Sequence, residues 1–142
     1  MGVPIGLVLD CADPARVGAF WRPALGYVEQ APPEGYASWA AYDAAEGLTS
    51  DQIGYSIVDP DGDRPSIFFQ RVPEPKVAKN RLHIDIKLSA GAPRPSAEER
   101  RRIEAGVAPL VELGATVLRR NQDPDDWFIV MADPEGNEFC LV

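Results

Sequence analysis

The single histidine of the chain, His83, stands in a segment that alternates between apolar and polar residues. The apolar positions are Leu82, Ile84, Ile86 and Leu88, and the polar positions between them are His83, Asp85 and Lys87. This period of two predicts a strand with one buried and one uncovered face. Because an imidazole titrates near neutral pH, His83 on the uncovered face suits general acid–base catalysis or hydrogen bonding to a ligand. The alternative is a structural imidazole bonded to Asp85, Gln70 or water.

The segment 137–142 alternates in the same way, with Phe139 and Leu141 on one face and Glu138, Cys140 and Val142 on the other. We expect the apolar faces of both segments to pack on helices, which leaves the polar faces to meet a ligand. With two positions from the first half of the chain, the predicted ligand-binding set is Phe68, Gln70, His83, Asp85, Glu138 and Cys140. The sequence places no base beside Cys140, and such a cysteine is more often a small buried apolar residue than a nucleophile.

Two turns of the same composition occur about seventy residues apart. Asp59-Pro-Asp-Gly62 precedes an apolar run at 66–72, and Asp133-Pro-Glu-Gly136 precedes the terminal segment. Proline sets φ at one central position, and glycine tolerates the positive φ needed later in the turn. Too few oxygen donors stand at the spacing of a calcium loop. The recurrence indicates an internal duplication.

The first half of the chain predicts a β-α-β-β-β unit. A helix is expected from Pro14 to about Ala24, with Asp13 as its N-cap and Gly26 as its left-handed C-cap. Pro23 is expected to end this helix early or to bend it. The helical stripe, which puts Trp21 in the core, is Val17, Phe20, Trp21 and Leu25. The predicted strands are 5–10, 27–30, 36–42 (with Trp39), 53–58 and 67–72, and 44–51 is a predicted loop.

The segment 73–81, which contains two prolines and little apolar content, predicts a linker. The pattern then restarts. A capping box from Ser96 to Glu99 opens a helix that Gly114 ends and that Pro109 is expected to kink. The apolar stripe of this helix is Ile103, Val107, Leu110 and Leu113. The predicted strands are 82–88, 115–119, 127–132 and 137–142, with a loop at 91–95 and an acidic turn at 121–126.

Together these elements predict an α+β fold. Two tandem β-α-β-β-β modules, residues 1–72 and 82–142, are joined by the linker 73–81 in a single domain spanning 1–142. Each sheet has only one helix-covered face, so we expect the two modules to form a curved mixed sheet around a cleft. Exposed sheet edges favour a homodimer.

Composition narrows the classes of function. The chain of 142 residues, with 45% hydrophobic and 25% charged residues, is typical of one soluble globular domain. A net charge of −8 argues against binding to nucleic acid or to an anionic membrane, since both need clustered cations. There is no apolar run near the ~20 residues of a membrane span and no signal-peptide pattern, so a cytoplasmic location is expected. The two cysteines, Cys11 and Cys140, predict no disulfide framework.

Several stretches together resemble the glyoxalase-like domains of the vicinal oxygen chelate superfamily. They are 9–21 with its Asp13-Pro14 cap, Leu25-Gly26, Phe69-Gln70-Arg71, 80–85 with His83, Leu113-Gly114 and 131–141. The likeness spans essentially the whole chain and implies the glyoxalase/bleomycin resistance/dioxygenase fold. The superfamily contains glyoxalase I, extradiol dioxygenases, methylmalonyl-CoA epimerase, fosfomycin-modifying enzymes and metal-free bleomycin-binding proteins. A shared fold therefore leaves the reaction open.

The resemblance also implies positions for metal ligands. In metal-dependent members, the first and last strands of each module supply one ligand each, usually His or Glu. These positions match His83, Cys140, Gln70 and either Gly6 or Val8 of this chain. Glycine and valine offer no side-chain ligand and a glutamine amide is neutral, whereas a divalent ion favours three or four His or carboxylate donors. The resemblance thus implies an incomplete metal site.

Two functions are compatible with this pattern. The incomplete ligand set favours a protein that binds a small organic molecule in the cleft between the modules without the full metal site of the family. The alternative is a metal-dependent lyase, isomerase or dioxygenase in which His83 holds Zn, Ni, Mn or Fe, with Cys140 and the neighbouring Glu138 as unusual partners. His83 is the predicted catalytic residue. Trp39 and Trp127 either stack on a flat ligand or belong to the core.

Overall fold

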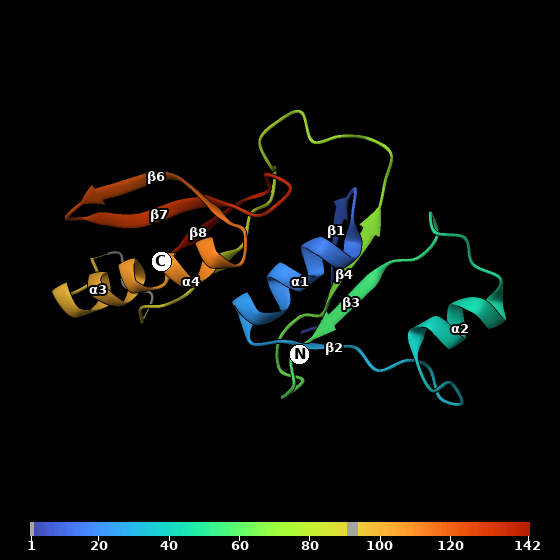
Figure 1. The fold of residues 1–142 in the computed structure, drawn as a ribbon. Helices are drawn as coiled ribbons and strands as arrows, with labels where there is room; N and C mark the ends of the chain where they lie inside the picture. Colours follow the sequence, from blue (N-terminus) through green and yellow to red (C-terminus); the bar gives the residue numbers. More distant parts are fainter. Residues whose placement is uncertain (1, 91–93) are drawn as a thin grey trace. The chain divides into compact units, whose positions relative to one another are not determined.

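The computed structural model describes residues 2–90 and 94–142. The chain divides into two compact units, residues 1–75 and 76–142, each with its own four-stranded mixed sheet and its own helices (Figure 1). The prediction of an α+β fold built from two β-α-β-β-β modules is therefore confirmed. The loop predicted at 91–95 falls largely on 91–93, which lie outside the described residues.

Unit 1 is built around a sheet with the strand order β1-β4-β3-β2. Its elements are β1 (Leu7–Cys11), α1 (Pro14–Leu25), β2 (Val28–Glu29), α2 (Trp39–Glu46), β3 (Tyr55–Val58) and β4 (Ile67–Arg71). The strands β1 and β4 are parallel, and the other pairs are antiparallel. Helix α1 packs on β3 and β4 and buries Val17, Phe20 and Trp21, as its apolar stripe predicts.

The caps of α1 follow the sequence prediction. The Asp13 carboxylate accepts a hydrogen bond from the backbone N–H of Arg16 at 3.1 Å, and Gly26 ends the helix in the left-handed region at φ 68°. The helix continues through Pro23 to Leu25, so the expectation of an early end at Pro23 is wrong. A proline in the last turn removes a single donor, and the turn still closes because the N–H groups of Gly26 and Tyr27 bond to carbonyls of that turn.

The predicted strand at 36–42 is wrong, because this segment opens helix α2. Ser38 caps that helix by accepting the N–H of Ala41 at 3.1 Å, and Gly47 ends it with φ 65°. The intervening WAAYDAAE is rich in alanine, the residue that favours helix most. The aromatic residues of this segment contact one another edge to face, Tyr36 with Tyr42 and Tyr42 with Trp39. With α2 as an insertion, three strands follow α1, as in the β-α-β-β-β pattern.

Unit 2 has the strand order β5-β8-β7-β6. Its elements are β5 (Asp85–Ile86), α3 (Ala97–Ala105), α4 (Val107–Glu112), β6 (Thr116–Asp123), β7 (Asp126–Ala132) and β8 (Glu138–Leu141). The capping box is confirmed, since Ser96 Oγ accepts from Glu99 N and the Glu99 carboxylate accepts from Ser96 N. Helix α3 packs on β7 and helix α4 on β6.

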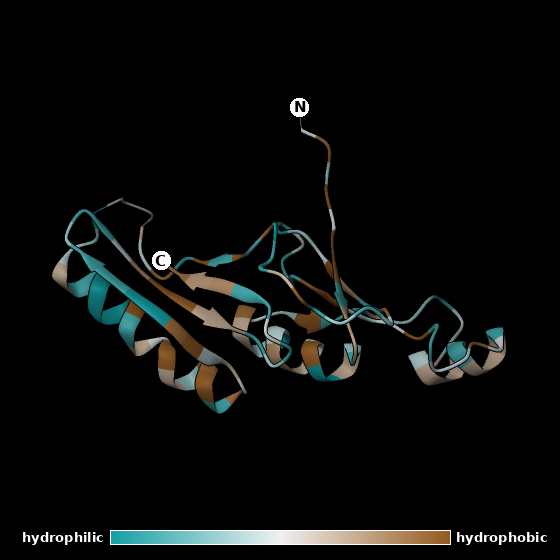
Figure 2. Cartoon of the chain, turned by 90° about the horizontal axis from the view of Figure 1, so that it is seen from above, coloured by the Kyte–Doolittle hydropathy of each residue, from teal (hydrophilic) through white to brown (hydrophobic). Residues whose placement is uncertain are grey.

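The helix predicted across 97–113 is interrupted, as its proline indicates. The break falls at Gly106, between α3 and α4. Pro109 has no backbone N–H and therefore cannot bond to the carbonyl of Ala105, four residues earlier. Figure 2 shows α3 as largely hydrophilic and α4 as largely hydrophobic. Ile103, Val107 and Leu110 are buried, whereas Leu113 is half-exposed because it stands after the end of α4.

Two strands of unit 2 differ in length from their predictions. The strand predicted at 82–88 is shorter in the structure, where β5 is Asp85–Ile86, although the Ile84 carbonyl and the Leu88 N–H also bond to the backbone of Cys140 and Val142. Leu82 lies before this pairing and is exposed, and among the described strands β5 is an edge strand beside β8. The turn between β6 and β7 is shorter than the acidic turn predicted at 121–126. The first residues of the predicted turn belong to β6, and the hairpin closes at the pair Asp123 and Asp126.

The two Asp-Pro-x-Gly segments form equivalent turns. Gly62 and Gly136 have φ of 77° and 85°, and their N–H groups bond to the carbonyls of Asp59 and Asp133 at 3.0 and 2.9 Å. Both aspartate residues are buried, and their carboxylates accept backbone N–H groups of the following residues. The turns are therefore structural, as predicted.

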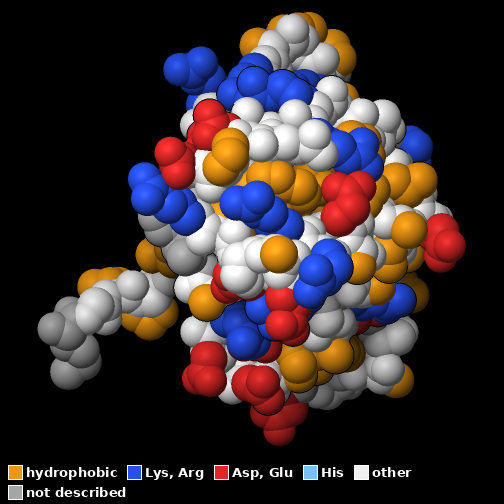
Figure 3. Space-filling model, turned by 90° about the vertical axis from the view of Figure 1, so that its left-hand side faces the viewer, with side chains coloured by type: hydrophobic (Ala, Val, Ile, Leu, Met, Phe, Trp, Pro, Cys, Tyr) orange, Lys and Arg blue, Asp and Glu red, His pale blue; other side chains and the backbone are white. Residues whose placement is uncertain are grey.

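No helix among residues 2–90 and 94–142 is both long and apolar enough to cross a membrane. On the face drawn in Figure 3, acidic and basic side chains are interspersed with apolar ones.

Candidate functional site

The sheet of unit 2 has one face in the core and one outside it. Phe139 and Leu141 of β8 are fully buried, together with Met131 and Ile129, their register partners on β7. Side chains alternate along a strand, so Cys140 projects from the opposite face. Its register partner on the parallel strand β5 is Asp85. The facing predicted from the alternation is thus confirmed for β8.

Three predicted site residues meet on this second face of the unit 2 sheet. One ligand atom each of His83, Asp85 and Cys140 lies within 4.8 Å of the other two. His83 Nδ1 is 3.7 Å from Asp85 Oδ1, which is longer than a hydrogen bond. The side chains of His83 and Asp85 are 42% and 47% exposed, while Cys140 is buried. A ligand can therefore reach the imidazole and the carboxylate.

The Cys140 thiol is held in its protonated form by its surroundings. Burial raises the pKa of Cys140, and the nearby charge of Asp85 raises it further, against smaller opposing effects of Lys79 and Arg119. A thiol with a raised pKa is a poor nucleophile at neutral pH. Cys140 on its own is thus unsuited to covalent catalysis, in line with the reading of a small buried residue.

Glu138 precedes Cys140 by two residues and has its own partners. Its carboxylate accepts hydrogen bonds from Lys76 Nζ at 3.0 Å and from the backbone N–H of Asn80 at 2.9 Å. Burial opposes ionisation of Glu138, but these hydrogen bonds and the Lys76 charge outweigh it and hold the pKa below its usual value. The carboxylate ties the segment 76–80 to β8, and it is not part of the group of three.

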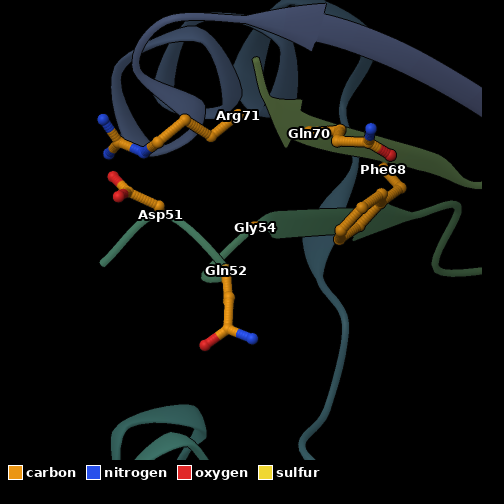
Figure 4. Close-up of a pocket in the computed structure, with 6 residues that line it drawn as sticks. All are labelled: Asp51, Gln52, Gly54, Phe68, Gln70 and Arg71. Carbon is orange, nitrogen blue, oxygen red and sulfur yellow. The ribbon is translucent and has the colours of Figure 1, made fainter. Parts of the chain in front are cut away.

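The predicted residues of unit 1, Phe68 and Gln70, line a pocket of about 320 Å³. The other lining residues are Asp51, Gln52, Gly54 and Arg71 (Figure 4). Three of these come from the segment between α2 and β3, and Arg71 ends β4. Sequence reasoning missed all four, because a loop and a strand end carry no periodic signal that shows what they surround.

Gly54 determines where the Phe68 ring lies. A Cβ atom at position 54 would overlap the Cζ and Cε2 atoms of that ring, and it would lie 2.9 Å from the carbonyl oxygen of Phe69. The ring therefore rests against bare backbone, and it is 38% exposed at the pocket. An exposed ring in this position offers a flat apolar surface to a ligand.

The two remaining tryptophans of the prediction lie apart from these sites. Trp127 is two residues before Ile129 on β7, so it projects from the same core face and is half-buried. Trp39 opens α2, and its indole N–H donates to the Gln30 carbonyl at 2.6 Å. Trp21 belongs to the core, as predicted.

The group His83, Asp85 and Cys140 has donors that a metal ion accepts. Imidazole, carboxylate and thiolate are all zinc ligands, and three protein ligands are typical of catalytic zinc sites. Ligand atoms of a tetrahedral zinc site stand about 3.3–3.8 Å apart, given bonds of about 2.0–2.3 Å. Because the donors here lie within 4.8 Å of one another, modest side-chain movement would close the site. The chemistry of the donor set therefore fits a divalent metal.

Solved structures with the same fold are similar over almost the whole chain. A possible glyoxalase from Bacillus cereus shares 13% identity at a TM-score of 0.62, covering 100% of this chain and 99% of its own. A glyoxalase/bleomycin resistance protein/dioxygenase family enzyme from Burkholderia phytofirmans PsJN shares 12% sequence identity at a TM-score of 0.62. The match covers 95% of this chain and 93% of that enzyme.

A third structure was solved with its ligands. It is a variant of the fosfomycin resistance protein FosX from Listeria monocytogenes, complexed with Mn(II) and 1S,2S-dihydroxypropylphosphonic acid. It shares 12% identity at a TM-score of 0.62, with 99% of this chain and 89% of that chain covered. At these identities the likeness shows the fold.

Sequence comparison gives the family directly. No curated protein matches the chain. The family model described as a glyoxalase-like domain matches residues 6–142, which is nearly the whole chain. The chain therefore belongs to the glyoxalase-like domain family, and its two β-α-β-β-β units have the fold of these structural neighbours.

Proposed function

We propose that this glyoxalase-like protein binds a small organic molecule against the sheet surfaces that its helices leave uncovered. The observation that carries the proposal is the pocket of unit 1, whose lining contains Phe68 and Gln70, two positions expected from the sequence to face a ligand. The Phe68 ring offers an apolar surface, and the polar side chains around it can fix the orientation of a ligand. The pocket volume of about 320 Å³ suits a ligand at the small end of that range.

A fragment screen tests this proposal. Fragments that bind are expected to shift the amide NMR signals of Phe68 and Gln70, and Phe68→Ala is expected to weaken them severalfold. Leu118→Ala is a matched control, because Leu118 is a similarly exposed apolar residue on β6 of unit 2. Hits that shift only other regions, or that bind equally well to Phe68→Ala, would overturn the proposal.

The group His83, Asp85 and Cys140 supports a second function, that of a metal-dependent lyase, isomerase or dioxygenase. The three side chains would hold a divalent ion such as Zn, Ni, Mn or Fe, which when bound supplies a Lewis acid for a substrate oxygen. A neighbour of the same fold binds Mn(II) and a phosphonic acid, which supports this candidate. His83 and Asp85 are exposed enough for substrate to approach them.

Metal analysis separates the two functions. Stoichiometric Zn, Ni, Mn or Fe retained through purification, and lost in His83→Ala together with any turnover, supports the second candidate. Purified protein without metal that binds fragments at Phe68 and Gln70 supports the first. Lys87→Ala is a control, since Lys87 lies near His83 in sequence but outside the group of three.

A homodimer remains part of the proposal. The edge strands of both sheets, β1 and β2 in unit 1 and β5 and β6 in unit 2, have one unpaired side among the described strands. Such edges pair readily with a second copy of a chain. Light scattering during size-exclusion chromatography is expected to give twice the chain mass, and a monomer mass at high protein concentration would contradict this.

A further inference from the structure

The pocket of unit 1 separates its charged groups from its apolar group. The charged ends of Asp51 and Arg71 lie at one side of the pocket, and the Phe68 ring lies at the other side (Figure 4). A ligand that fills the pocket therefore meets an anion and a cation together at one end and a flat apolar surface at the other.

Both charges are available to a ligand. Within residues 2–90 and 94–142, neither the Asp51 carboxylate nor the Arg71 guanidinium forms an ion pair or a side-chain hydrogen bond with another residue, and both residues are exposed. The two groups do not form a salt bridge with each other, so no guanidinium nitrogen of Arg71 lies within 4.0 Å of a carboxylate oxygen of Asp51. A ligand that carries both a cation and an anion can therefore pair with the two residues at once.

The loop that carries Asp51 is held in place. Gln52 Oε1 accepts hydrogen bonds from the backbone N–H of Thr49 at 2.9 Å and from its hydroxyl at 3.1 Å. Gln52 N–H in turn donates to the Thr49 carbonyl at 2.9 Å. These three bonds close a turn around position 51, so the carboxylate is presented from a defined backbone.

The apolar end is also defined by the fold. The Phe68 ring lies over Gly54, where any side chain would displace it. The side-chain amide of Gln70, on the same face of β4, has no hydrogen-bond partner within the described part of the chain. It is free to bond a polar substituent of a ligand.

We propose that this pocket binds a small zwitterion with a flat apolar tail, of the chemical class of an aromatic α-amino acid. The ligand ammonium pairs with Asp51, the ligand carboxylate with Arg71, and the ring stacks on Phe68. Arginine suits the carboxylate because its guanidinium donates two parallel hydrogen bonds. This inference rests on the proposed small-molecule function and names the ligand class of the same site.

Four matched probes test the charge requirement. L-phenylalanine carries both charges, its N-acetyl derivative only the negative one, its amide only the positive one, and L-alanine both charges without the ring. Titrations at low ionic strength, followed by amide NMR shifts of the pocket residues, are expected to rank L-phenylalanine first. Each missing charge is expected to weaken binding by about two- to fivefold, since exposed ion pairs contribute little each.

Two variants assign each charge to its partner. Asp51→Asn is expected to abolish the preference for L-phenylalanine over its N-acetyl derivative, and Arg71→Gln the preference over its amide. Asp61→Asn and Arg101→Gln are matched controls, because both residues are exposed and lie outside the pocket. Thermal unfolding midpoints close to wild type check that each variant folds.

The outcomes are distinguishable. Equal binding of the three phenylalanine probes, or equal weakening of all three by both variants, overturns the zwitterion assignment. Neutral fragments that bind at Phe68 and Gln70 as tightly as L-phenylalanine overturn it too, but leave the small-molecule function standing. If no probe and no fragment shifts the signals of Phe68 and Gln70, both the assignment and the proposed function fail.

Discussion

Asp85 on β5 and Cys140 on β8 are register partners in a parallel strand pair, so their side chains leave the sheet on the same face. His83 lies two residues before Asp85 and reaches the same place. The group therefore combines one donor from the terminal strand β8, one from β5 and one from the segment just before β5.

Zinc titrated into the protein is expected to bind at this group. His83→Ala and Cys140→Ser each remove one of three donors, so each is expected to weaken zinc binding by about tenfold or more. Cobalt(II) as a zinc substitute gives a second measurement, since its thiolate charge-transfer absorption should be lost in Cys140→Ser. Cys11→Ser is the matched control, because Cys11 is a buried cysteine of unit 1. Unchanged cobalt absorption in Cys140→Ser would remove Cys140 from the site.

Glu138→Gln is expected to destabilise the protein by about 1–2 kcal/mol at neutral pH, since a charged acceptor of two hydrogen bonds is lost. The pKa of Glu138 is lower in the folded protein than in the unfolded chain. The ionised carboxylate therefore stabilises the fold fully above the ordinary glutamate pKa of about 4.3. This stabilisation is lost as the pH falls through the lowered pKa of the folded protein. The variant should therefore lose less stability than wild type on acidification. Urea unfolding between neutral and acidic pH measures this.

Glu112→Gln serves as the comparison for Glu138, because Glu112 is an exposed glutamate at the end of α4. It should follow the wild-type curve at every pH. The same loss of stability in both variants would show that net charge, rather than the contact with Lys76 and Asn80, determines the effect.

Gly54→Ala is expected to destabilise unit 1 by about 1–3 kcal/mol, because the added methyl group overlaps the Phe68 ring. Combining it with Phe68→Ala should recover part of that loss, since the obstructing ring is then absent. A double-mutant cycle from denaturant unfolding measures this coupling. Part of the cost should remain, because the carbonyl oxygen of Phe69 also stands 2.9 Å from the new atom.

Gly2→Ala is the control for this cycle, since a Cβ atom at position 2 meets nothing within 4 Å. It should leave the free energy of unfolding nearly unchanged. Strict additivity of Gly54→Ala and Phe68→Ala would show that the ring does not depend on the glycine.

Ser38→Ala is expected to loosen α2 by about 1 kcal/mol, because the Ser38 hydroxyl caps the N-terminus of that helix. None of the residues of α2 is buried, so tertiary packing offers little compensation. Hydrogen exchange of the α2 amides should become faster while that of α1 is unchanged. Ser50→Ala, an exposed serine between α2 and β3, should have no such effect.

Local signals in the sequence predicted much of this structure. The Asp13 cap, the capping box at Ser96 and the two Asp-Pro-x-Gly turns appear where the residues indicate, because each depends on hydrogen bonds between near neighbours. The strand expected at 36–42 was wrong, because the Ser38 and Gly47 caps around an alanine-rich segment favour a helix.

By itself, the sequence determined the two-module fold and the alternation that puts Glu138 and Cys140 opposite the core residues of β8, since these depend on short-range periodicity. Only the tertiary structure decided which distant residues meet. Lys76 reaches Glu138 across 62 positions, and Asp51 and Arg71 share a pocket with Phe68. Such contacts depend on strand register and loop path, which arise from packing over the whole unit and leave no local pattern in the chain.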